Sequence, residues 1–137
     1  SEIKNIFDIS GRAMAAQMVR LNTVASNLAN AGTISGTKEE AFRALKPVFQ
    51  TTYADQLKAS GVSTVDVVTV AEVKRAPEQA FMPHHPSADA NGFVYRAAVD
   101  ENEEMVEMVE ASRQYQNNVE VISTIRALMM RTINMGK

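Results

Sequence analysis

The most regular pattern in the sequence is a heptad spacing of apolar and small residues that begins at Phe7. The steps between these residues alternate between four and three. The stripe consists of Phe7, Gly11, Met14, Met18, Leu21, Ala25 and Leu28. Such spacing is typical of the seam of a coiled coil. It predicts a helix from about residue 8 to about residue 30, with Asp8 or Ser10 as its N-cap and Gly32 ending it in a left-handed conformation.

A second heptad pattern runs through the last third of the chain. Its members are Met105, Met108, Ser112, Tyr115, Val119, Ile122, Arg126, Met129 and Ile133. Another apolar stripe, formed by Val121, Ile125 and Leu128, lies beside it. Acidic residues crowd the start of this segment and basic residues lie near its end, which complements the helix dipole. We therefore predict a helix from about residue 101 to about residue 134, with Gly136 as its stop.

The middle of the chain has a different texture. Residues 62–74 are rich in Val and Thr and predict a strand. Residues 89–92 form a turn signal before a second short strand at 93–95. Residues 42–54 are ambiguous, because they have strand character but contain Pro47, which argues against a continuous helix.

These elements predict a mainly α fold. We expect the N- and C-terminal helices, in residues 1–32 and 101–137, to form an antiparallel coiled-coil-like pair. The segment between them, residues 33–100, is expected to be a small β-rich insert that lies at one end of the pair or outside it.

The N-terminal helix carries unusually few charges. Between Ala13 and Thr37 the only charged residue is Arg20. A helix that faces water normally has charged residues opposite its apolar stripe. This helix could be a partly exposed helix of one globular domain, or it could be enclosed by other protein chains, and we favour the second interpretation. Whether the amides of Asn22 and Asn27 bond within one subunit or between subunits stays open at this point.

Composition narrows the range of functions. The chain has 137 residues, 45% of them hydrophobic and 22% charged, with a net charge of −2 and no cysteine. The charge balance indicates neither nucleic acid nor an anionic membrane as a partner. No stretch approaches the ~20 apolar residues of a membrane span, and the N-terminal segment lacks the apolar core of a cleaved signal peptide.

Candidate sites for metals and catalysis are weak. His84 and His85 adjoin each other, but no cysteine or Glu-x-x-His motif supports them, so an exposed loop is the better interpretation. Glu103, Glu107 and Glu110 share one helical face without the histidine that a di-iron site needs. We expect these acids to form a solvated, dipole-matched start of the helix. The sequence predicts no catalytic residue, no metal site and no cofactor, and hence no enzyme.

Several segments resemble one family. SNLANAGT at residues 26–33 is similar to the N-terminal motif of the bacterial flagellar axial proteins, which form the rod and the hook. HPSADANGFV at 85–94, the segment 104–124 and the ending RTINMGK at 131–137 favour the proximal-rod class of that family.

The resemblance implies a structural subunit of the flagellar proximal rod, the driveshaft of the basal body. Such subunits self-assemble through their terminal helices and transmit torque toward the distal rod and hook. The implied partners are copies of the chain, other rod proteins, and components of the membrane ring and export apparatus. The implied location is the basal body, in the part of the rod that spans the periplasm, after type III export without a cleaved signal. The alternative is a soluble helical adaptor or secretion partner that docks other helices.

The predicted assembly interface combines the two heptad stripes with the asparagines of the N-terminal helix. Its residues are Phe7, Met14, Met18, Leu21, Asn22, Ala25, Asn27, Leu28, Asn30, Met105, Met108, Ser112, Tyr115, Val119, Ile122, Ile125, Met129 and Ile133.

Overall fold

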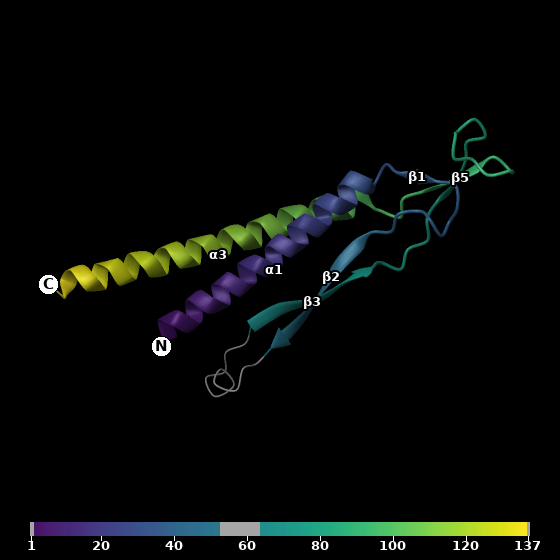
Figure 1. Cartoon of the computed structure of the whole chain (residues 1–137). Helices are drawn as coiled ribbons and strands as arrows, with labels where there is room; N and C mark the ends of the chain where they lie inside the picture. Colours follow the sequence, from purple (N-terminus) through teal and green to yellow (C-terminus); the bar gives the residue numbers. More distant parts are fainter. Residues whose placement is uncertain (1, 53–63, 137) are drawn as a thin grey trace.

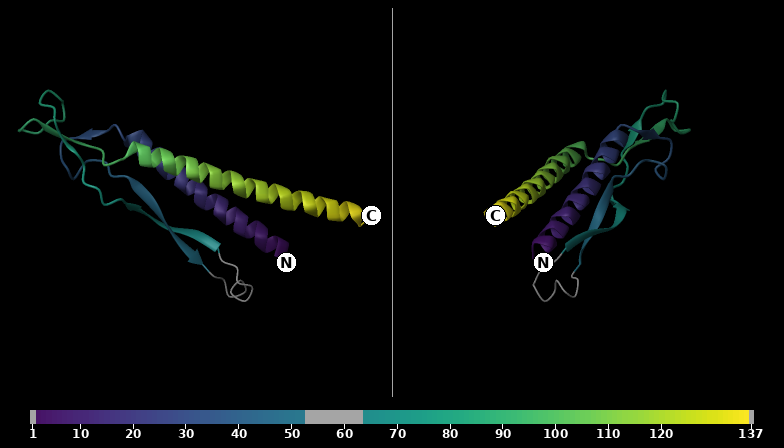
Figure 2. Two further views of the ribbon diagram at one scale, coloured as in Figure 1. Left: turned by 180° about the vertical axis from the view of Figure 1, so that it is seen from behind. Right: turned by 60° about the vertical axis from the view of Figure 1, so that its left-hand side comes forward.

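Two long helices dominate the computed structural model, which describes residues 2–52 and 64–136. Helix α1 spans Glu2–Asn30 and helix α3 spans Glu101–Met135. They pack against each other and run in opposite directions, so that both chain termini lie at the same end (Figure 1). Figure 2 shows that the helices diverge toward this end. We call it the open end of the pair, and the end where α3 begins the closed end.

Helix α1 begins earlier than the sequence predicted. Asp8 and Ser10 were expected to cap it, but both lie inside the helix, and Ser10 is buried. The reason is tertiary: Ile3 and Ile6 line a groove with apolar residues of α3, which supports the additional turns.

The end of α1 also differs from the prediction. Within the described residues only Gly92 has a positive φ, so Gly32 does not end the helix in a left-handed conformation. Instead the chain leaves α1 in a turn at Asn30. The carbonyl oxygen of Asn30 accepts from the backbone N–H of Thr33 at 3.1 Å and from the Thr33 hydroxyl at 2.8 Å.

Helix α3 confirms the predicted C-terminal helix. Asp100 is its N-cap, and the carboxylate accepts hydrogen bonds from the backbone N–H groups of Asn102 and Glu103 at 3.0 and 3.2 Å. Three acidic residues occupy the first turn, and the C-cap is Gly136.

The segment between the helices forms two small antiparallel sheets. Strands β1 (Ile34–Ser35), β5 (Phe93–Arg96) and β4 (Gln79–Phe81) form a three-stranded sheet in that order. Strands β2 (Leu45–Thr52) and β3 (Thr64–Glu72) form a hairpin. The predicted strands correspond to β3 and β5, and the ambiguous segment forms β2. Residues 53, 54, 62 and 63 of these predictions lie outside the described residues.

The insert is not confined to one end of the helix pair. The three-stranded sheet lies beyond the closed end, whereas the β2–β3 hairpin turns back and packs along α1 (Figures 1 and 2). The sheet thus lies at one end of the pair, and the hairpin lies outside it, along α1.

The core of this arrangement is thin. Among the residues whose burial is described, the buried apolar ones are small, alanines together with Val24 and Val94. Large apolar side chains of α3 stay exposed instead, including Val106, Leu128 and Ile133 at 54–65%. Monomeric proteins rarely leave so many large apolar side chains in water along one element, which indicates that other surfaces cover them.

Candidate assembly interface

Helix α1 does not use its apolar stripe to face the rest of the chain. Its buried residues are small or polar: Ser10, Ala16, Thr23, Val24 and Asn27. Both α3 and the β2–β3 hairpin pack against α1, and the small buried side chains of α1 let these elements approach closely. The predicted stripe is therefore turned away from the most buried face, and its members are exposed or half-buried.

The side of α1 that faces away from α3 and the hairpin is uncovered. Between Ala13 and the end of the helix, all exposed residues are uncharged: Ala15, Met18, Asn22, Ala25 and Ala29. They follow a heptad spacing, and we call them the uncharged face of α1. No charge interrupts it because Arg20, the one charged residue of this segment, lies on the opposite side and contacts α3.

Helix α3 packs through a stripe that only partly matches the prediction. Its less exposed residues are Glu104, Glu107, Met108, Ala111, Tyr115, Asn118, Ile122, Ile125 and Met129. The remaining members of the predicted stripe are exposed and lie along one side: Met105, Ser112, Val119, Arg126 and Ile133. We call these five residues the exposed flank of α3.

Arg20 joins the two helices. Its Nη2 donates to Glu107 Oε2 at 2.6 Å and lies 3.7 Å from Glu110 Oε2, while its Nη1 donates to Gln17 Oε1 at 3.0 Å. The Arg20 side chain is only 16% exposed. The acids at the start of α3 were expected to be solvated, and this expectation was wrong for Glu107, which bonds Arg20 on the half-buried seam, whereas Glu110 stays 56% exposed.

Asn27 is the most buried polar residue of the helix pair, with 1% of its surface exposed. Its Nδ2 donates to the carbonyl oxygen of Leu45 at 2.8 Å and to Glu104 Oε2 at 3.1 Å. Its Oδ1 accepts from the backbone N–H of Leu45 at 2.9 Å. Asn27 is thus satisfied inside the subunit, which removes it from the predicted interface. Asn30 donates to the carbonyl oxygen of Ser26, within its own helix, at 2.8 Å.

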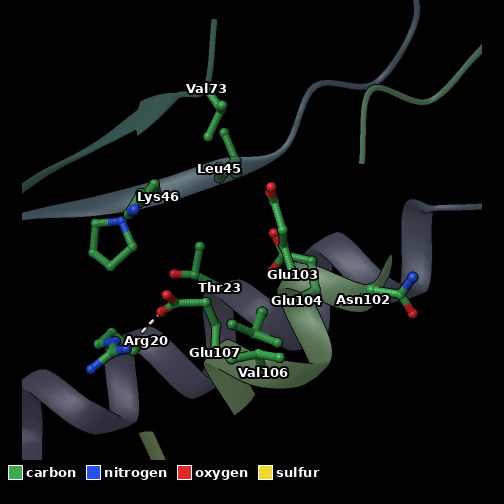
Figure 3. Close-up of a pocket in the computed structure, with 12 residues that line it drawn as sticks. Arg20, Thr23, Leu45, Lys46, Val73, Asn102, Glu103, Glu104, Val106 and Glu107 are labelled. Atoms are coloured by element: carbon green, nitrogen blue, oxygen red, sulfur yellow. Dashed lines mark hydrogen bonds and ion pairs between the residues drawn. The ribbon is translucent and has the colours of Figure 1, made fainter. Parts of the chain in front are cut away.

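A cleft opens beside this junction. Figure 3 shows its lining, to which α1 contributes Arg20 and Thr23, strand β2 contributes Leu45, and α3 contributes Glu104 and Glu107. Three of its carboxylates have partners: Glu107 accepts from Arg20, Glu104 accepts from Asn27, and Glu103 pairs with Arg75. The cleft therefore marks a polar contact between three elements, α1, β2 and α3.

The histidine-containing loop is ordered by its own contacts. His84 is exposed, and His85 Nδ1 accepts from the backbone N–H of Ser87 at 3.0 Å. Asp89 Oδ1 accepts from the backbone N–H groups of Asn91 and Phe93, both at 2.9 Å. Within residues 2–52 and 64–136, no group of three or more histidines and acids is placed to hold a metal ion.

The predicted interface residues fall into three groups. Asn27 is buried. The exposed members are Met18, Asn22, Ala25, Met105, Ser112, Val119 and Ile133. The half-buried members are Phe7, Met14, Leu21, Leu28, Asn30, Met108, Tyr115, Ile122, Ile125 and Met129.

At the open end, an apolar groove runs between the helices. Ile3 and Ile6 of α1 line it together with Ile125, Leu128 and Ile133 of α3. These side chains are half-buried or exposed, so the pair of helices does not close over its own apolar surface at this end.

Sequence reasoning missed Arg20, Glu104 and Glu107 as residues that organise the helix pair. One signal pointed to Arg20: a single charge in an otherwise uncharged helix needs a partner of opposite sign when it is buried. The partners could not be chosen from the many acids at the start of α3.

Comparisons with known proteins agree on one family. The family model "Flagella basal body rod protein" matches residues 7–33, and "Flagellar basal body rod FlgEFG protein C-terminal" matches residues 90–135. The chain is 43% identical to flagellar basal-body rod protein FlgC of Salmonella typhimurium over 134 residues, which cover 97% of each chain. The identity is 42% to FlgC of Escherichia coli O6:H1 and 41% to FlgC of Yersinia enterocolitica, with the same coverage.

In the described part of the chain, neither long helix contains a stretch apolar enough to cross a lipid bilayer.

Proposed function

We propose how this chain, which belongs to the FlgC family of flagellar basal-body rod proteins, builds the rod. It is a structural subunit of the rod in the bacterial flagellar basal body, and it is not an enzyme. Family membership decides against the alternative of a soluble helical adaptor. Our proposal concerns which surfaces make the contacts between subunits and what these contacts do.

The terminal helices, in residues 1–32 and 101–137, form the part of the subunit that assembles, and residues 33–100 form an insert attached to it. One observation carries this proposal. The uncharged face of α1 is exposed along its whole length, although an exposed helix surface is normally charged. Burial against another protein explains this composition, because a charge enclosed without a partner would be costly.

The exposed flank of α3 complements this face. The uncharged face of α1 consists mainly of small side chains, whereas the flank carries Met105, Val119 and Ile133, which are 52%, 39% and 55% exposed. Large side chains of one helix pack well between small side chains of another when both follow heptad spacing. We propose that the flank of one subunit packs through Met105, Ser112, Val119 and Ile133 on the uncharged face of the next and completes a coiled-coil-like layer of helices. The long side chain of Arg126, the one charged member of the flank, lets its guanidinium reach water at the edge of this contact.

This contact joins two different surfaces of identical or related subunits. A contact of that kind does not close on itself unless the rotation between subunits makes a ring, and otherwise it generates a helical assembly. It therefore fits the rod, where copies of this chain meet each other and other rod proteins. Packed helices around an axis resist twisting, as a shaft that carries torque toward the distal rod and hook requires.

The remaining partners follow from the same family membership. We propose contacts with the membrane-ring and export components where the rod begins, in the periplasmic part of the basal body. We also propose that the subunit passes through a narrow export channel, because a chain with few large buried residues among those described is readily unfolded for such passage.

Cross-linking through introduced cysteines tests the proposed contact. Because the chain contains no cysteine, only the introduced thiols of this subunit can react. The variant Ala25→Cys/Val119→Cys should give cross-linked dimers and longer ladders in isolated basal bodies when treated with a short bifunctional thiol reagent. The matched control is Ala25→Cys/Asn117→Cys, which places the second thiol at an exposed position outside the flank. Equal ladders from both variants, or from neither, would contradict the proposed pairing.

A further inference from the structure

The carboxamide of Asn27 occupies the place of a neighbouring β-strand. Leu45 is the first residue of β2, and both of its backbone polar groups bond to Asn27 rather than to β3. In a hydrogen-bonded pair of an antiparallel sheet, the opposite residue accepts from the N–H and donates to the C=O of its partner. The Asn27 amide makes the same two bonds to Leu45. Asn27 thus covers the free edge of the hairpin at its first residue.

The remaining donor of the same amide reaches the other helix. Nδ2 has two hydrogens, and the second bonds Glu104 Oε2 at 3.1 Å in the first turn of α3. Asn27 therefore touches three elements at once: α1, which carries it, β2 at Leu45, and α3 at Glu104. Because the residue is 1% exposed, water does not readily substitute for these bonds.

The side chain has no simple replacement. Aspartate keeps an acceptor for Leu45 N–H, but it cannot donate to the Leu45 carbonyl and would place a second carboxylate against Glu104. Alanine makes none of the three bonds. Asn22, five residues earlier on the same helix, is exposed and offers a matched control for changing an asparagine of α1.

We propose that Asn27 is a positioning residue that fixes the β2–β3 hairpin at a set angle to the helix pair, and that rod assembly requires this angle. The first half stands on the contacts of one subunit. The second half rests on the proposed function, since it matters only if the hairpin must reach a defined place among neighbouring subunits.

Amide hydrogen exchange on the purified full-length chain tests the first half. In Asn27→Ala, exchange at the Leu45 amide should accelerate about tenfold or more, because an ordinary hydrogen bond changes an opening equilibrium by about that factor. Amides of Ala111 and Tyr115 in α3 should change by less than about twofold, as should every amide in Asn22→Ala. Unchanged exchange at Leu45, or fast exchange there in the unmodified chain, would overturn the inference.

A distance measurement tests the angle itself. Spin labels at Val48→Cys in the hairpin and Gln116→Cys in α3 occupy exposed positions and should give one narrow distance distribution. The distribution should broaden in Asn27→Ala and in Asn27→Asp. Adding Glu104→Gln to Asn27→Asp should narrow it again in part, because the glutamine amide donates to the new carboxylate. Equally broad distributions with and without Glu104→Gln would contradict the proposal that residue 27 links β2 to α3 through Leu45 and Glu104.

Assembly supplies the last readout. Cells with Asn27→Ala should lack rods and swimming motility, while the helical content of the purified variant stays within about a tenth of the original. If exchange and distance respond but rods form normally, the requirement for a fixed angle is overturned. The cross-link between positions 25 and 119 remains a separate test of the proposed interface, so a failure of that interface can be distinguished from a failure of the role of Asn27.

Discussion

Arg20 and Glu107 form the ion pair that joins the two long helices, with Nη2 and Oε2 2.6 Å apart. Arg20 is 16% and Glu107 36% exposed, and Glu110 lies 3.7 Å from the same guanidinium nitrogen. Arg20 therefore binds Glu107 on the half-buried seam and also lies within ion-pair distance of the more exposed Glu110. Polar contacts of this kind fix which turns of two helices face each other, because a shifted register would leave the charge unpaired.

The first prediction concerns this ion pair. Arg20→Met should lower the free energy of unfolding by about 1–2 kcal/mol, since it removes charge-assisted hydrogen bonds and leaves two carboxylates side by side. Urea denaturation of the purified chain measures the effect. The matched control is Arg113→Met on an exposed position of α3, which should cost less than about 0.5 kcal/mol. Equal losses in the two variants would show that the ion pair has no special role.

The pair should also respond to salt. Raising the ionic strength from about 0.1 M to about 1 M shortens the screening length from roughly 10 Å to roughly 3 Å. The difference in unfolding free energy between the original chain and Arg20→Met should shrink but persist, because the arginine is mostly buried. A difference that vanishes at high salt would indicate a solvated pair.

The second prediction concerns the uncharged face of α1. Ala25→Glu should leave the isolated chain folded, because position 25 is exposed and glutamate is a good helix former. In cells it should block rod assembly, since a carboxylate would be buried against the next subunit without a partner. The readouts are circular dichroism of the purified chain and basal-body yield.

Two further variants make this prediction more specific. Asn102→Glu adds the same charge to the acidic first turn of α3, and we expect it to assemble normally. Leu21→Asp should also block assembly, but it should in addition lower the stability of the isolated chain because Leu21 is half-buried. Normal motility with Ala25→Glu or Leu21→Asp would contradict the proposed interface.

The helices could be predicted because their heptad patterns are long. What the sequence could not decide is which face of each helix packs inside the subunit. In α3 the packed stripe shares Met108, Tyr115, Ile122 and Met129 with the predicted one and differs at alternate positions. Apolar residues at regular spacing indicate that a helix face is buried. They do not show whether the same chain or another chain buries it. In α1 the small buried residues make room for two elements, which no local pattern reveals.

Polar contacts between residues far apart in the sequence could not be predicted either. Asn27 reads locally as a weak helix former, and its partners, Leu45 and Glu104, are 18 and 77 residues away. Pro47 made the prediction of β2 ambiguous because the sequence does not show which of its residues bond the partner strand. The backbone groups of Leu45 point away from β3, so those of Pro47, two residues later on the same strand, do so as well. Its missing N–H therefore costs no bond of the ladder.

The third prediction is a gradient of protection along the helix pair. Amides near Thr23 and Asn27 are enclosed by α3 and the hairpin, whereas Ile3, Ile6, Leu128 and Ile133 are 40–55% exposed at the open end. Isolated helical segments are only marginally stable without packing. Hydrogen exchange of the purified chain should thus be slow around residues 23–27 and fast at both termini. Uniformly strong protection across residues 8–30 and 105–134 would contradict this prediction.

The fourth prediction separates the tip of the insert from the helices. Gly92 has a φ of +84°, and a Cβ at this position would lie 2.9 Å from the ring of Phe81 and 3.1 Å from Pro83. That ring also packs edge-to-face on Phe93, with centroids 5.3 Å apart. Gly92→Ala therefore meets both an unfavourable backbone conformation and a closed space, and it should weaken the turn by about 1–3 kcal/mol.

Gly11→Ala is the matched control, because Gly11 lies inside α1 and a Cβ there has no atom within 4 Å. It should raise the free energy of unfolding by about 0.5–1 kcal/mol through the better helix propensity of alanine. The measurement is amide exchange at Met82 and Phe93, whose backbone N–H groups bond Gly92 and Asp89. Exchange there should accelerate in Gly92→Ala but not in Gly11→Ala, and exchange in α3 should accelerate in neither variant. Loss of protection throughout α3 in Gly92→Ala would show that the tip and the helix pair unfold as one unit.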